Sequence, residues 1–131
     1  MSKYDLKKFD QEILGYLEAY KKFKSKHNTW TLLSSEFRTY HKSLLYGMTI
    51  DEVYKTEKGI VLLDLKTTSE TYLNTWSVQL SAYKNGYESQ HEKVIKTYIL
   101  KLNKDGEYQL FELSDKFSVF LSCLEIYRFG E

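Results

Sequence analysis

Two aspartates and a lysine carry the clearest chemistry in this sequence. Asp64 and Lys66 stand two residues apart at the end of an apolar stretch, 60–63, and Asp51 lies upstream of them. Oxygen ligands without histidine or cysteine favour a hard cation, Mg²⁺ or Mn²⁺, over zinc. A lysine beside such a cation can orient or deprotonate an attacking water and offset phosphate charge. The three residues therefore predict metal-assisted hydrolysis of a phosphodiester bond.

The elements around Asp64 must bring the two aspartates together. Residues 46–56 and 59–68 have the pattern of two strands joined in a β-hairpin through a short polar stretch with a glycine. Side chains alternate faces along a strand, so Asp64 and Lys66 point the same way. A loop of two or four residues puts Asp51 opposite Asp64, whereas a three-residue loop with a glycine bulge turns Asp51 to the other face. Two carboxylates that face each other repel and destabilise the hairpin. A divalent cation bound between them would explain why both are present.

A third carboxylate could come from the preceding extended segment, residues 30–41. Glu36 lies on one face of this segment, and an in-register pairing with the next strand lets it neighbour Asp51. The other interpretation is a solvated residue of a charged strand. The sequence leaves both open.

The segment after Lys66 returns to helical spacing, with aromatic residues recurring every three or four positions from Ser69 onward. Gln79 and Tyr83 are four residues apart and so lie on one face of this helix. A buried amide needs hydrogen-bond partners, which makes Gln79 hard to explain as a packing residue. Tyr83 has two interpretations, an active-site group or a ring packed in the core.

Periodicity supplies the rest of the fold. A helix is predicted over 4–24, a second hairpin over 93–113 with its turn at Asp105-Gly106, and a last helix over 115–129. The order helix, three strands, helix, two strands, helix predicts an α/β domain of mixed α+β character, with a small mixed sheet of about five strands flanked by helices. Two sets of side chains are expected to face the core. They are Phe9, Ile13, Tyr16, Leu17, Tyr20 and Phe23 in the first helix, and Phe117, Phe120, Leu121, Leu124 and Tyr127 in the last.

Composition places the whole chain, residues 1–131, in one folded domain. Hydrophobic residues make up 42% and aromatic residues 16%, which is too apolar for a disordered tail. A formal charge of +1 neither supports nor excludes a nucleic-acid partner. No apolar run reaches the ~20 residues of a membrane span, and the first residues lack the apolar core of a secretory signal. A cytoplasmic location is therefore expected.

The chain has a single cysteine, Cys123. One cysteine rules out an intramolecular disulfide, a four-cysteine iron–sulfur cluster and an all-cysteine zinc site. The apolar residues around Cys123 predict a thiol buried in the core.

In their order, these residues resemble the PD-(D/E)XK nuclease superfamily, and within it the RecB-like exonucleases that phages and repair systems use. The family pattern is an early glutamate, an aspartate after a strand, (D/E)-x-K-T at the end of the next strand, and Q-x-x-x-Y in the helix that follows. The matching residues here are Glu36, Asp51, Asp64-Leu65-Lys66-Thr67, Gln79 and Tyr83. The chain departs from the pattern at Met48, where a glycine is usual, and in having no histidine in the first helix. The resemblance covers the central half of the chain.

The resemblance implies a restriction-endonuclease-like core and a metal-dependent DNA nuclease. Asp51 and Asp64, with Glu36 as the third candidate, would bind Mg²⁺ or Mn²⁺. Lys66 would act in catalysis, and Gln79 and Tyr83 would serve the active site and the DNA, together with the threonine of the motif, Thr67. Exonuclease activity is expected rather than sequence-specific cutting, because nothing in the chain resembles a base-reading module.

Two alternatives stay open beside the exonuclease. One is a junction resolvase on the same core, and the other is a catalytically silent nuclease-fold protein that binds DNA or inhibits a partner. DNA is the expected partner, and a second copy of the chain or a recombination or replication protein could join it. A phage-encoded protein of this kind would work in the host cytoplasm.

Basic residues gather in the first third of the chain and could meet DNA phosphates. Arg38 and Lys42 are the nearest of them to the motif residues, and a solvated surface is the simpler interpretation of the whole set. The set is Lys21, Lys22, Lys24, Lys26, Arg38 and Lys42.

Overall fold

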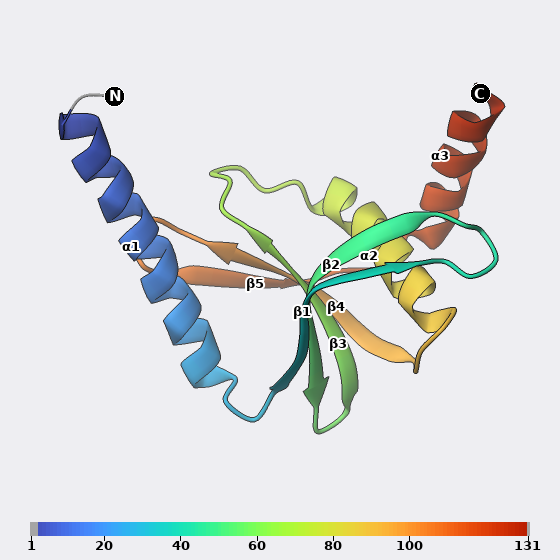
Figure 1. Cartoon of the computed structure of the whole chain (residues 1–131), viewed down its shortest axis with the longest axis horizontal. Helices are drawn as coiled ribbons and strands as arrows, with labels where there is room; N and C mark the ends of the chain where they lie inside the picture. Colours follow the sequence, from blue (N-terminus) through green and yellow to red (C-terminus); the bar gives the residue numbers. More distant parts are fainter. Residues whose placement is uncertain (1–2, 131) are drawn as a thin grey trace.

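A five-stranded β-sheet organises the protein, which we describe from a computed structural model covering residues 3–130 (Figure 1). The strands lie in the sheet in chain order, and neighbours are antiparallel except for the parallel pair β3 and β4. A parallel pair needs a crossover connection, which helix α2 (Leu73–Glu88) supplies. The strands are β1 (Thr31–Tyr40), β2 (Gly47–Thr56), β3 (Gly59–Lys66), β4 (Val94–Leu102) and β5 (Tyr108–Glu112).

Helices cover both faces of the sheet. Helix α1 (Lys3–Lys26) packs on one face, where its Phe23 is buried against Tyr54 of β2 and Tyr108 of β5. Helix α2 packs on the other face, where Trp76 and Leu80 join a second cluster of buried residues. Helix α3 (Phe117–Phe129) follows β5 and packs against α2. The element order αβββαββα and the mixed sheet confirm the predicted fold class.

Strand β3 is buried on both of its faces along most of its length. Ile60 and Leu62 belong to the cluster under α2, whereas Val61 and Leu63 belong to the cluster under α1. A strand of this kind can accept charged side chains only where it leaves the layers. Its charged residues accordingly come at its C-terminal end, which carries the predicted motif.

The predicted core face of α1 is correct only in its second half. Phe9 and Ile13 are exposed because the first half of the helix extends past the sheet (Figure 1), and Leu17, in the second half, is exposed because it lies on the side of the helix that faces away from the sheet. The contact begins near Gly15, where a Cβ atom would lie 1.9 Å from the backbone carbonyl oxygen of Lys104 in the β4–β5 turn. Glycine therefore lets the helix cross that turn closely.

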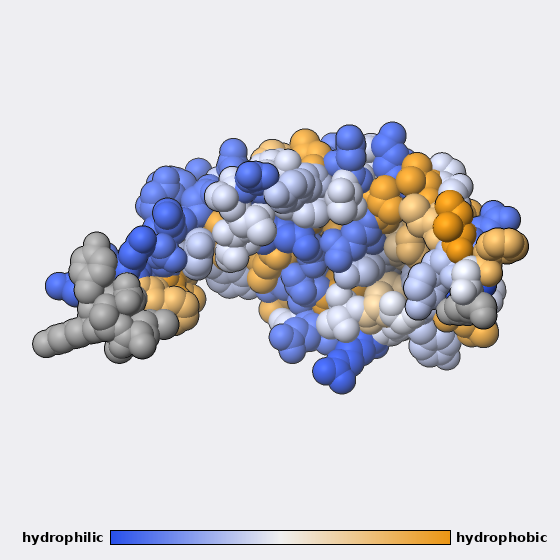
Figure 2. Space-filling model, turned by 90° about the horizontal axis from the view of Figure 1, so that it is seen from above, coloured by the Kyte–Doolittle hydropathy of each residue, from blue (hydrophilic) through white to orange (hydrophobic). Residues whose placement is uncertain are grey.

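The prediction that five side chains of α3 face the core was wrong for part of that helix. Leu121 is 38% exposed and Tyr127 is 70% exposed, whereas Phe117, Phe120 and Leu124 are half-buried. The physical reason is that α3 packs on α2 rather than on the sheet, so that only a narrow side of it is covered. Figure 2 shows the resulting apolar surface at the α3 end of the molecule.

Cys123 was expected in the core and instead is exposed. The apolar residues around Cys123 lie on several sides of α3, and α2 covers only one of these sides. Within residues 3–130, every helix falls short of the length and apolar character needed to cross a lipid bilayer.

Candidate active site

The β2–β3 hairpin has a two-residue turn, Glu57-Lys58. Thr56 pairs with Gly59, and the ladder continues in the same register to the pair Glu52 and Leu63. The next positions of that register are Asp51 and Asp64, as the two-residue loop predicted. Asp51 Oδ2 accepts a hydrogen bond of 2.8 Å from the backbone N–H of Leu65, which holds its carboxylate against the end of β3.

Asp64 is a buried carboxylate that forms an ion pair with Lys66. Asp64 is only 5% exposed, and the Nζ atom of Lys66 lies 2.9 Å from its Oδ2 atom. That approach lacks hydrogen-bond geometry, and Oδ2 has no hydrogen-bond partner in the described part of the chain. The pKa of Asp64 is raised to about 6: burial is the largest cause, the neighbouring Asp51 carboxyl adds to it, and Lys66 opposes both.

Glu52, the residue after Asp51, is a useful contrast because it is equally buried but points to the α1 face. Its two carboxylate oxygens accept hydrogen bonds from the hydroxyls of Tyr20, at 2.6 Å, and Tyr54, at 2.8 Å. Glu52 is thus satisfied within the fold, where it ties α1 to β2. Asp64 is instead balanced by an ion pair with Lys66 and has a second carboxylate, Asp51, beside it.

Lys66 connects the carboxylates to helix α2. Its Nζ atom lies 3.5 Å from Oε1 of Gln79, at the outer limit of a hydrogen bond. Gln79 Nε2 donates to the hydroxyl of Tyr83 at 2.9 Å, so the i, i+4 pair predicted on one helical face is in contact. The ring of Tyr83 packs against the core while its hydroxyl accepts a hydrogen bond from Gln79, so its position is compatible with both interpretations. Burial raises the pKa of Tyr83, and the nearby Asp64 charge adds to this.

These residues form one connected set that we call the network: Asp51, Asp64, Lys66, Gln79 and Tyr83. They come from β2, β3 and α2 and meet where β3 ends. The C-terminal edge of parallel strands beside a helix is a common place for sites in α/β proteins.

A hard divalent cation fits the donor set of this network. Two carboxylates side by side at one sheet edge match the oxygen ligands that Mg²⁺ and Mn²⁺ prefer. Mg²⁺ commonly uses only one or two protein carboxylates and keeps several waters. Among residues 3–130, no three histidine, cysteine, aspartate or glutamate side chains gather closely enough to form a cation site without added waters.

Glu36 does not join the two aspartates. The pairs Ser35–Glu52 and Phe37–Ile50 bracket Glu36 and Asp51 at facing positions, as an in-register pairing of β1 with β2 predicted. However, Glu36 has a φ of 50°, a left-handed conformation that interrupts the alternation of the strand, and its side chain is exposed. The backbone conformation, which the sequence pattern does not reveal, separates Glu36 from the network.

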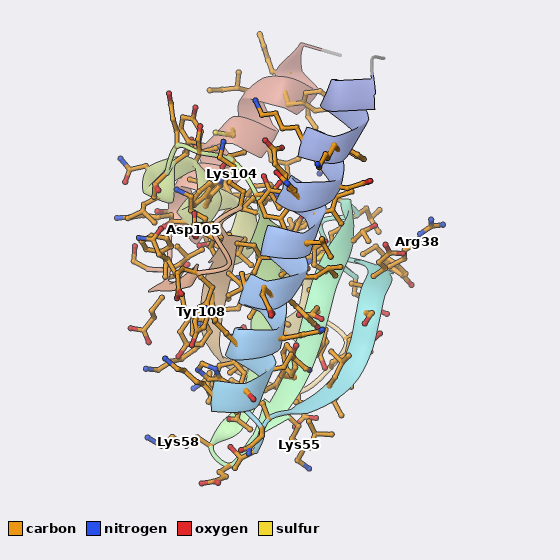
Figure 3. The ribbon with its side chains drawn as sticks, turned by 90° about the vertical axis from the view of Figure 1, so that its left-hand side faces the viewer. Arg38, Lys55, Lys58, Lys104, Asp105 and Tyr108 are labelled. Atoms are coloured by element: carbon orange, nitrogen blue, oxygen red, sulfur yellow. The ribbon has the colours of Figure 1, made fainter. Side chains whose placement is uncertain are left out.

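The other DNA-contact candidates lie outside the network. Thr67 is exposed and lines a different hollow of about 350 Å³, beside Tyr16 of α1 and the β4–β5 turn. Arg38 and Lys42 are exposed on β1 and the loop after it, and Figure 3 shows Arg38 pointing away from the strands. Within the described chain, these three side chains make no hydrogen bond to the network.

One residue at this edge of the sheet was not predicted from the sequence. Lys101 of β4 is paired in register with Lys66 of β3 and is only 5% exposed. Its Nζ atom donates to the carbonyl oxygen of Ser69, at 2.9 Å, and to the hydroxyl of Thr71, at 3.1 Å. Lys101 therefore fixes the loop that joins Lys66 to α2. A lysine at the end of the apolar strand 98–100, parallel to the strand of Lys66, was the available signal.

The comparisons with known proteins bear on the fold alone. No protein-family model matches the chain, and no curated protein sequence matches it. Among solved structures, the crystal structure of SSO0001 is similar with a TM-score of 0.51 and 14% sequence identity. The similarity covers 93% of this chain and 58% of SSO0001, so the chain spans little more than half the length of that protein.

Proposed function

We propose that the protein is a metal-dependent nuclease that hydrolyses phosphodiester bonds in DNA, acting on strand ends rather than at a specific sequence. The observation that carries this proposal is the buried Asp64 carboxylate, which lies beside a second carboxylate, Asp51, and forms an ion pair of 2.9 Å with Lys66. Two adjacent carboxylates repel each other, and a cation bound between them is the simplest compensation. The chemistry of its neighbours matches phosphodiester hydrolysis.

Asp51 and Asp64 would hold one Mg²⁺ or Mn²⁺ ion, with water in its remaining positions. The bound cation would act as a Lewis acid on the phosphate and on the attacking water. Lys66 would place its ammonium beside the phosphate and offset the negative charge that builds up while a P–O ester bond breaks and the leaving oxygen takes a proton. Gln79 holds Lys66 in position and is itself held by Tyr83.

A panel of DNA substrates tests the proposal. The protein would be incubated with linear duplex, closed circular, single-stranded and four-way junction DNA, in Mg²⁺, in Mn²⁺ and in EDTA. We expect cleavage of DNA that has ends, in either metal ion and not in EDTA. The variant Asp64→Ala, prepared in parallel, reports contaminating nucleases.

Each of the other outcomes identifies a different function. Selective cleavage of the junction would support a resolvase, and cleavage of closed circles would show endonuclease activity. Tight binding of DNA without cleavage in any metal ion would support a catalytically silent DNA-binding protein. Cleavage that persists in EDTA would contradict the metal-dependent mechanism.

A further inference from the structure

An apolar groove lies between α2 and α3, directly beside the network. Its volume is about 640 Å³, and its third side is the segment that enters β2, including Tyr46. From α3 it is lined by Phe120, Cys123 and Leu124. Figure 2 shows the apolar surface that surrounds this end of the molecule.

The walls of the groove are held in place by hydrogen bonds at both ends of α3. At its start, the backbone N–H of Lys116 donates to the hydroxyl of Ser81 on α2 at 2.7 Å. At its end, the guanidinium of Arg128 donates to the carbonyl oxygen of Leu44 at 2.5 Å. The groove is therefore a formed feature of the fold and does not need a partner to open it.

The groove and the network share two residues. Gln79 and Tyr83 line the groove, and Gln79 also contacts Lys66, the neighbour of Asp64. A ligand in the groove therefore lies next to a phosphate held at the carboxylates. In a nucleic acid, the group one sugar away from a phosphate is a base.

The lining suits a flat aromatic ring. The rings of Phe120 and Tyr46 lie edge to face with their centroids 4.7 Å apart. The Tyr46 hydroxyl is already used, because it donates to the carbonyl oxygen of Ala82 at 2.6 Å. Apolar and aromatic surface is what a nucleobase stacks on, without regard to which base it is.

We infer that this groove binds an unpaired nucleobase of the DNA strand whose phosphate is cleaved. A base within a duplex is stacked and paired and cannot enter, so the substrate is a single strand or the frayed end of a duplex. This inference rests on the proposed nuclease function. It adds the strandedness of the substrate, which the catalytic residues alone leave undetermined.

Cys123 offers a test that needs no mutation, because it is the chain's only cysteine and its side chain is exposed in the groove. The rate of its alkylation by a maleimide would be measured with no DNA, with a single-stranded oligonucleotide and with an abasic strand of equal length, all in Ca²⁺ in place of Mg²⁺, so that a cation is present while cleavage is slowed. With the normal strand at about ten times its dissociation constant, we expect alkylation to slow about tenfold, because only the unoccupied fraction reacts. The abasic strand, which has the phosphates but no bases, should have little effect.

A variant separates base binding from general crowding by DNA. Phe120→Ala removes a stacking surface and should abolish most of the protection, whereas Val119→Ala, on an exposed part of the same helix, should keep it. Circular dichroism of both variants checks that they fold. If Phe120→Ala does not fold, cleavage by the native protein of a strand with one abasic position beside the cut site replaces it, with slower cleavage expected.

The outcomes distinguish failure of this inference from failure of the proposed function. Equal protection by the normal and abasic strands, or no protection by either, overturns the base-binding groove even if the protein cleaves DNA. Protection by the normal strand alone supports the groove even if no DNA is cleaved in any metal ion. In that case the nuclease proposal fails and the groove belongs to a binding protein for single strands.

Discussion

At the scale of single residues, the network could be foreseen because its geometry follows from simple spacing rules. Strand alternation puts Asp64 and Lys66 on one face, the register of a two-residue turn puts Asp51 beside Asp64, and an i, i+4 spacing joins Gln79 to Tyr83. Glu36 and Lys101 could not be placed in the same way. A left-handed backbone at Glu36 and a loop folded back onto Lys101 are conformations that no periodic pattern encodes.

Asp64 predicts a stability cost in the metal-free protein. Because its folded pKa of about 6 lies above the ordinary value for aspartate, the folded state holds a proton that the unfolded state has lost, and stability falls as the pH rises from about 4 to 6. Asp64→Asn lacks this cost. In EDTA at pH 8, we expect it to be more stable than the native protein by about 1–3 kcal/mol, with a smaller difference at pH 4.5.

Thermal melting at the two pH values measures this effect. Asp10→Asn, a change of the same kind on the exposed surface of α1, is the matched control and should melt like the native protein. If Asp64→Asn melts at or below the native temperature at pH 8, the buried Asp64 carboxylate does not carry the stability cost predicted here.

Lys101 predicts a role in positioning the loop after Lys66. Lys101→Met removes the donor to Ser69 and Thr71, so the amides of residues 68–71 should exchange hydrogen several-fold faster, and DNA cleavage should fall about tenfold through misplacement of Lys66. Hydrogen-exchange mass spectrometry and a cleavage assay measure the two effects. Lys93→Met, at an exposed lysine just before the same strand, is the control, and unchanged exchange in Lys101→Met would contradict the positioning role.

At the scale of elements, the sequence predicted which segments form helices and strands better than it predicted what covers them. The apolar faces of α1 and α3 have correct helical spacing, yet Phe9, Leu17 and Tyr127 face solvent. Periodicity measures the apolar side of a helix, whereas burial depends on whether another element lies opposite that side. The buried strand β3 was easier because residues on both of its faces are apolar.

The crossing of α1 over the β4–β5 turn predicts an effect of Gly15→Ala. Alanine is a better helix former by about 1 kcal/mol, but its Cβ would lie 1.9 Å from the Lys104 carbonyl oxygen, which is backbone and cannot rotate away. We expect the clash to outweigh the gain and to destabilise the protein by about 1–3 kcal/mol. Urea unfolding measures this change in stability, and Gln11→Ala, one turn earlier, is the control. An increase in the stability of Gly15→Ala would show that the helix and the turn are farther apart than described.

At the scale of the whole molecule, α1 and α3 extend past the sheet on either side of the end of β3, which carries the network (Figure 1). The net charge of +1 gives no overall attraction to DNA, so affinity has to come from the site and its surroundings. A bound cation is the strongest local charge such a protein can acquire.

Cation binding should therefore be visible in the stability of the whole protein. With Mn²⁺ at 100 times its dissociation constant, the native protein should gain about 2.7 kcal/mol, a rise of roughly 10 °C in melting temperature. Asp51→Ala should lose most of this gain, and Glu57→Ala, which changes an exposed carboxylate in the hairpin turn, should keep it. Equal gains in all three proteins would mean that Mn²⁺ binds elsewhere.

The most direct test of the central claim is the cleavage rate of end-labelled linear DNA in Mg²⁺ by the native protein and by Asp64→Ala and Lys66→Ala. Glu57→Ala and Lys58→Ala, at the opposite end of the same hairpin, are the matched controls. We predict that each network variant loses activity by about a hundredfold or more while both controls cleave like the native protein. Cleavage by Asp64→Ala or Lys66→Ala at close to the native rate would contradict a catalytic role for that residue.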